Sequence, residues 1–153
     1  MGKTAARRLE VWDVRDIPPV KHGDISPADQ ESARCVEFSV NDWAKGSVLI
    51  RAERAGEKAL VSFDKGNYFL FKVSESNQKE ITGEQFDAFI ESLLTEYNFL
   101  NWNAEYRDPN LLDGINWKIA VFFGNQPPLV RRGSNAFPPC WDEVCSAFEH
   151  LIR

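Results

Sequence analysis

The sequence is poor in the residues and segments that several classes of protein require. It contains only three cysteines, Cys35, Cys140 and Cys145, which is an odd number and too few for the disulfide framework of a small secreted domain. No stretch approaches the roughly 18 apolar residues of a membrane-spanning helix, and residues 1–8 lack the apolar run of a signal peptide. We therefore expect a cytoplasmic protein with reduced thiols and no membrane association.

Basic residues are also scarce relative to acidic ones. The chain has 18 Lys and Arg against 23 Asp and Glu, which gives a net charge of −5. Binding to nucleic acids depends on cationic side chains that replace the counterions of the phosphates, so this balance argues against direct nucleic-acid binding. The acidity is concentrated in residues 75–113, where nine acidic and two basic residues give −7 and leave +2 for the remainder.

Motifs with a known catalytic or nucleotide-binding mechanism are missing. The sequence has no phosphate-binding loop, no dinucleotide-binding glycine pattern, no nucleophile elbow and no zinc-protease helix. His22 stands beside Asp24 as a base beside its orienting group would, but a Pro/Gly-rich segment rarely fixes the geometry that proton transfer needs. His150 falls in the last turn of a predicted helix, where an imidazolium suits the helix dipole.

The cysteines predict neither a metal nor a cofactor. Zinc sites need two ligands beyond a pair such as Cys140 and Cys145, and only Cys35 and two scattered histidines remain. Cys140 is the better redox candidate, because the start of a helix lowers the pKa of a thiol. The alternative is that both cysteines simply fill the core.

The hydrophobic pattern divides the chain into an arm and one domain. Residues 1–33 are partly irregular, with a short apolar stretch at 9–12 and the signature of a helical turn at 26–29. Residues 34–153 read as a single α+β domain without internal repeats or a linker. At this length a chain buries about 70% of its unfolded surface and needs no disulfide to fold.

Alternation of apolar and polar residues predicts strands, and the helical period predicts two helices. The expected strands are 34–40, 47–53, 58–64, 68–74, 114–124 and 129–132. Thr82 and Gln85 form a capping box at the start of a helix over 82–97, and a second apolar stripe predicts a helix from Trp141 onward. We expect an α+β fold in which two amphipathic helices cover an antiparallel sheet of about five or six strands. The residues expected to be buried together are Phe89, Leu93, Trp117, Ile119, Val121, Trp141, Val144 and Phe148.

Two short motifs in the second half of the chain are distinctive. Leu112-Asp113-Gly114-Ile115-Asn116-Trp117 opens the long predicted strand, and Gly133-Ser134-Asn135-Ala136-Phe137-Pro138 leads into the last helix. Over roughly residues 86–153 this pattern resembles small uncharacterised bacterial proteins with a D-G-x-x-W strand followed by G-S-N-A-[YF]-P. The resemblance implies the order of strand, turn and helix, and it implies no activity.

Acidic and aromatic residues give the strongest functional signal. Glu84, Asp87, Glu91 and Glu96 occupy the polar side of the predicted helix 82–97, which contains no Lys or Arg. A face of one sign attracts a basic partner, although a merely soluble surface explains four acids equally well. Aromatic residues crowd the next segment, so we expect a partner-binding surface that also includes Trp102, Glu105 and Tyr106.

A second candidate site lies before the last helix. Arg131 and Arg132, followed by Ser134 and Asn135, have the composition of an anion site at a helix start, although Ser134 and Asn135 could equally cap local backbone groups. Our favoured hypothesis is a non-enzymatic module that binds a basic protein, with inhibitors or immunity proteins that neutralise nuclease-like toxins as one physical example. The alternatives are an enzyme for a small molecule near Arg131 and Arg132, and a structural or self-assembling subunit.

Overall fold

The computed structural model describes residues 33–42, 46–67, 72–110, 114–124 and 126–153. The predicted arm, with its apolar stretch at 9–12, its helical turn at 26–29 and His22, lies outside the described residues except for Ala33, which begins the first strand. Most of the strand expected at 68–74 also lies outside them.

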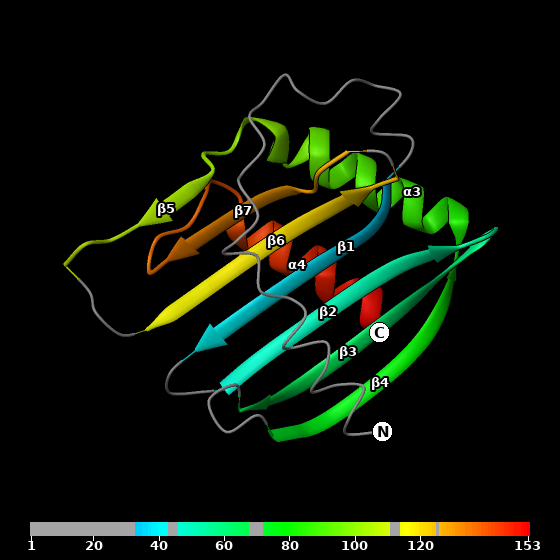
Figure 1. The fold of residues 1–153 in the computed structure, drawn as a ribbon, viewed down its shortest axis with the longest axis horizontal. Coiled ribbons are helices and arrows are strands. Elements are labelled where there is room, and N and C mark those ends of the chain that lie inside the picture. The colour runs from blue at the N-terminus through cyan, green and yellow to red at the C-terminus, as the bar shows by residue number, and fades with distance from the viewer. Residues whose placement is uncertain (1–32, 43–45, 68–71, 111–113, 125) are drawn as a thin grey trace.

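A sheet of seven strands forms the centre of the fold (Figure 1). In chain order these strands are β1 (Ala33–Asp42), β2 (Gly46–Ala55), β3 (Lys58–Asn67), β4 (Lys72–Thr82), β5 (Glu105–Arg107), β6 (Ile115–Phe123) and β7 (Leu129–Ser134). Across the sheet their order is β4-β3-β2-β1-β6-β7-β5, and all neighbours are antiparallel except β5 and β7, which are parallel. The predicted α+β class is confirmed, with more strands than the five or six expected.

Two strands depart from the predicted pattern. β4 extends from Lys72 to Thr82, well beyond the end at 74 that the sequence predicted, and it pairs with β3 with one register shift, between Lys65 and Gly66 of β3. Its periodicity does not reveal the strand, because an edge strand whose side chains face water need not alternate apolar and polar residues. β5 has only three residues and is held by parallel pairing with β7, a contact that leaves no local sequence signal.

The two predicted helices are present, and the first ends irregularly. α3 (Gly83–Glu91) continues as one π-helical turn, η3 (Ser92–Glu96), and a short 3-10 turn, η4 (Phe99–Asn101), follows. The predicted capping box is confirmed: the Gln85 N–H donates to the Thr82 hydroxyl at 3.0 Å, and the Thr82 N–H donates to the Gln85 side chain at 2.9 Å. The last helix is α4 (Trp141–Ile152).

Both helices pack on the same face of the sheet (Figure 1) and enclose the main core. Phe148 of α4 stacks on Phe38 of β1 with ring centroids 4.4 Å apart and meets Phe89 of α3 edge-on at 4.9 Å. Of the eight residues expected in the core, six are buried, while Phe89 and Trp141 are partly buried and pack against the others. The aromatic rings therefore join both helices to the sheet.

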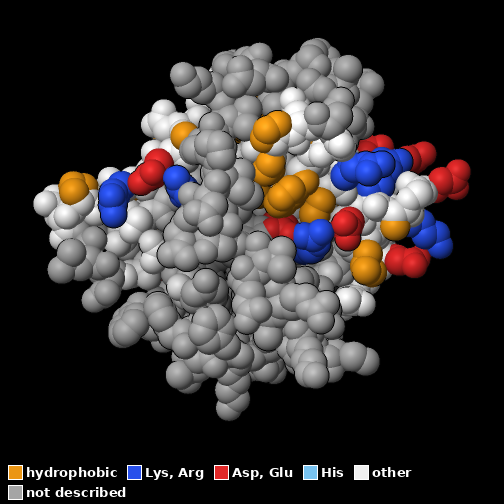
Figure 2. All heavy atoms as spheres, in the orientation of Figure 1, with side chains coloured by type: hydrophobic (Ala, Val, Ile, Leu, Met, Phe, Trp, Pro, Cys, Tyr) orange, Lys and Arg blue, Asp and Glu red, His pale blue; other side chains and the backbone are white. Residues whose placement is uncertain are grey.

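The opposite face of the sheet carries a mixture of polar and apolar side chains. Glu37 is buried there and pairs with Arg51, which also bonds Glu53 at 3.2 Å. Figure 2 views the molecule from this side and shows hydrophobic, basic and acidic side chains of the described residues next to one another. None of the helices in the described part of the chain is long and apolar enough to cross a lipid bilayer.

Candidate functional site

The four predicted acidic residues of the first helix face solvent. Glu84, Asp87, Glu91 and Glu96 are all exposed. The apolar stripe on the other side of α3 and η3 causes this orientation, because Phe86, Ile90, Leu93 and Leu94 are buried against the sheet.

The second helix enlarges this surface. Asp142, Glu143 and Glu149 of α4 are also exposed, and neither α3 with η3 nor α4 contains Lys or Arg. Since the Phe89–Phe148 contact holds the two helices side by side, their outer surfaces belong to one layer. We call this surface the acidic helical layer; its members are Glu84, Asp87, Glu91, Glu96, Asp142, Glu143 and Glu149.

Few cations neutralise the acidic helical layer. Arg54 of β2 pairs with Asp87, and Arg153 pairs with Glu149 at 3.3 Å. In the described part of the chain the other five carboxylates make no ion pair. Most of the negative charge of the layer is therefore left to attract an external cation.

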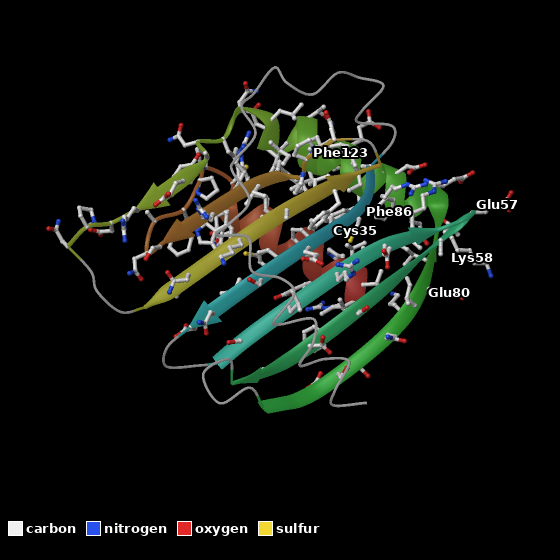
Figure 3. All side chains as sticks on the ribbon, viewed as in Figure 1. Cys35, Glu57, Lys58, Glu80, Phe86 and Phe123 are labelled. Carbon is white, nitrogen blue, oxygen red and sulfur yellow. The ribbon has the colours of Figure 1, made fainter. Side chains whose placement is uncertain are left out.

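A corner of mixed charge borders the layer where the sheet meets the start of α3. Lys58 of β3 and Glu80 of β4 lie side by side there, with nitrogen and oxygen 3.2 Å apart (Figure 3). Glu57 lies at the tip of the β2–β3 hairpin, and its carbonyl accepts the N–H of Gly83 at 2.8 Å. This bond fixes the start of α3 against the sheet.

The aromatic part of the predicted surface is mostly in the core. Trp102 is only 6% exposed, and its indole N–H donates to the carbonyl of Tyr97 at 2.9 Å. Tyr106 is half-buried against Trp117, with ring centroids 6.1 Å apart. Glu105 is exposed, but it lies across the sheet from Tyr106, on the face opposite the helices, and pairs with Arg132 at 3.8 Å. Trp102 and Glu105 therefore do not join the acidic helical layer.

A different aromatic pair adjoins the layer. Phe137 is 38% exposed, and its ring centroid lies 5.2 Å from that of the partly buried Trp141. Trp141 is the first residue of α4 and directly precedes Asp142 and Glu143. The sequence predicted the exposed aromatics at 101–106. The signal for this pair was a Phe in the turn segment before the last helix, close to the Trp that begins that helix.

Arg131 and Arg132 do not converge on one site, since neighbouring strand residues point to opposite faces of the sheet. Arg131 lies on the helix side, is 1% exposed, and donates to the carbonyls of Phe99 and Leu100 at 3.3 Å each. Burial lowers the pKa of its guanidinium. Arg132 points the other way, toward Glu105. The structure therefore gives the predicted anion site no common centre.

Asn135, Gly114 and Gly133 belong to the two distinctive motifs, and they connect the start of β6 with the turn that precedes α4. Asn135 has a left-handed φ of 56°, and its side-chain oxygen accepts the N–H of Ile115 at 2.9 Å. A Cβ on Gly114 would lie 2.1 Å from that oxygen, and a Cβ on Gly133 would lie 2.2 Å from the indole nitrogen of Trp117. Residue types at these positions are therefore fixed by close approach and backbone conformation.

No known protein family matches the sequence, and no curated protein matches it either.

Burial raises the pKa of all three thiols. Burial raises the pKa of Cys35 to about 12 and that of Cys145 to about 11. Cys140 takes the N-cap position of α4, where its thiol donates to the carbonyl of Tyr97 at 3.3 Å, and burial together with Glu143 raises its pKa. The expectation that the helix start lowers the pKa of Cys140 is therefore wrong, because its pKa is raised.

The described residues offer little for small-molecule or metal chemistry. Among them, no three side chains of His, Cys, Asp or Glu are grouped as a metal site would require. A shallow hollow of about 30 Å³ lies at the β4 side of the sheet, far below the roughly 300 Å³ of typical ligand pockets. It is lined by Val61, Phe63, Asn77, Gln78, Lys79 and Ile152.

Proposed function

We propose that the chain is a non-enzymatic binding module that holds a basic protein against the acidic helical layer and the Phe137–Trp141 pair. One observation carries this proposal: two packed helices present seven exposed carboxylates, and neither helix contains a Lys or Arg. An inhibitor or immunity-type protein that neutralises a basic partner is the physical example closest to this surface. Its place of action is the cytoplasm, in keeping with the reduced thiols that the cysteine count predicts.

At such a surface, electrostatics mainly determine the association rate, and packing mainly determines the affinity. Carboxylates of one sign steer a cationic partner and raise its association rate, because complementary fields act before contact. Affinity then requires a desolvated anchor, and aromatic side chains at the centre of an interface commonly supply it. Phe137 and Trp141 offer this anchor beside Asp142 and Glu143.

Charge reversal separates the acidic helical layer from the rest of the surface. We chose Glu91→Lys because Glu91 is exposed and forms no ion pair with any described residue, so folding should change by less than about 0.5 kcal/mol. Glu105→Lys is the control, since it makes the same change of charge on the opposite face of the sheet; it also removes the surface pair with Arg132, which contributes no more than about 1 kcal/mol.

The partner is first captured from the native host at low salt with the wild-type protein, and association rates are then measured by biolayer interferometry. We expect Glu91→Lys to slow association on the order of tenfold at low salt and Glu105→Lys to leave it nearly unchanged. At 0.5 M salt, wild type and Glu91→Lys should converge, because screening removes the attraction. Equal rates for wild type and Glu91→Lys at low salt would refute the proposal.

A further inference from the structure

β4 forms one edge of the sheet and has a long free side. It is the last strand in the order, and within the described ranges no strand pairs with its outer edge. Alternate residues of its regular part, residues 75–82, direct backbone N–H and C=O groups outward, where another strand can pair with them. Residues 75–78 and Glu80 are exposed.

The sequence of β4 is complementary to itself. When a second copy is laid antiparallel with Asn77 opposite Asn77, the two ranges Lys72–Thr82 lie alongside each other, and the pairs from Glu75 to Lys79 fall in the part of β4 that pairs regularly with β3. In this register Glu75 stands opposite Lys79 of the second copy, and Lys79 opposite its Glu75. No two like charges are opposite each other.

The other registers that an antiparallel pair allows are less favourable. A one-residue shift is excluded, because residues opposite each other must share a face and the same hydrogen-bonding edge. A two-residue shift about Gln78 sets Glu75 opposite Ile81 and loses both charge pairs. The shift about Ser76 pairs Lys72 with Glu80 only by including the part of β4 beyond its register shift against β3. Over the regular part of the strand, residues 75–82, charge complementarity therefore selects the register about Asn77.

We infer that β4 is the interface of a homodimer in which two copies pair antiparallel through their β4 edges about Asn77. The side chains allow it, since Glu75 is exposed and the ammonium of Lys79 donates to the backbone oxygen of Arg153, which uses one of its three protons. Residues opposite each other in an antiparallel pair share a face of the sheet, so both acidic helical layers come to lie on the same side. The inference does not depend on the proposed function.

The test uses charge reversals that repel themselves and attract each other. Glu75→Lys places Lys opposite Lys79, and Lys79→Glu places Glu opposite Glu75. Each variant alone should dimerise about 10- to 100-fold more weakly than wild type, because two cross-strand pairs change from attraction to repulsion. An equimolar mixture of the two variants should form a heterodimer, in which both pairs are again of opposite sign. Glu91→Lys, with the same change of charge away from β4, is the control and should dimerise like wild type.

Sedimentation equilibrium on the full chain gives the result. We expect wild type at twice the 17.5 kDa of one chain, each variant shifted toward the monomer, and the mixture restored to the dimer. Restoration in the mixture also shows that both variants are folded. A wild type that stays monomeric up to about 1 mM would overturn the inference, as would single variants that dimerise like wild type or a mixture that does not recover.

Discussion

Replacing Arg131 with Met tests the buried guanidinium, and its cost follows from the contacts. Two bonds to the carbonyls of Phe99 and Leu100, at 3.3 Å each, are long, so each contributes near the lower limit of about 1.5 kcal/mol for a charged donor. Contact with the Phe99 ring, 5.5 Å from its centroid, adds about 1 kcal/mol. Removing a buried charge returns part of this sum, because the guanidinium no longer has to be desolvated. We expect Arg131→Met to lower the free energy of unfolding by about 2–4 kcal/mol.

Urea unfolding followed by tryptophan fluorescence measures this difference, and Arg132→Met is the control at the next position. Arg132 makes a 3.8 Å surface pair with Glu105, and such pairs contribute no more than about 1 kcal/mol. The order of the two variants is the decisive observation. If they destabilise the protein equally, Arg131 does not hold η4 against the sheet, and a shared role of both arginines, such as the anion site, becomes the better explanation.

Three further perturbations test the core, the turn motifs and the thiols. Phe148→Ala should cost about 3–5 kcal/mol in denaturant titrations, and an unchanged midpoint would contradict the stacking on Phe38. Gly133→Ala forces a Cβ to within 2.2 Å of the Trp117 indole nitrogen, so the melting temperature should fall by several degrees; no fall would show that the strand yields freely. Thiols with raised pKa values stabilise the fold below their ordinary pKa of about 8.5, and this contribution disappears as the pH rises toward the value of about 12 for Cys35, so chemical denaturation should be easier at pH 11 than at pH 8 in wild type and less so in Cys35→Ala.

Local periodicity was enough to predict most of the elements. The alternation around Val36 and Phe38 and the stripe from Phe86 to Leu94 each reflect burial of one face, which the sequence records directly. The extent of β4 and the presence of β5 were not predicted, because neither strand buries an alternating row of apolar side chains. The strand order could not be predicted either, because pairing between distant strands depends on tertiary contacts.

The candidate site was predicted in part, and the failures have a common cause. The exposure of Glu84 and Glu91 follows from the apolar stripe on the same helix, so one helix suffices to predict it. Burial of Trp102 and Arg131 depends on the packing of η4 and β7, which lie far apart in the sequence. Addition of Asp142 and Glu143 to the same layer depends likewise on the packing of two helices.

The most distinctive motifs of the chain, around Gly114 and around Gly133 to Asn135, have a structural role. A left-handed residue such as Asn135, or a glycine in contact with an indole such as Gly133, tolerates few residue types, so it leaves a recognisable pattern in the sequence. Exposed carboxylates tolerate many arrangements, because a field depends on the sum of charges and not on their order. A surface that binds through charge is therefore expected to leave no motif, and the proposal made for this chain is based instead on the absence of Lys and Arg from two helices that the fold brings together.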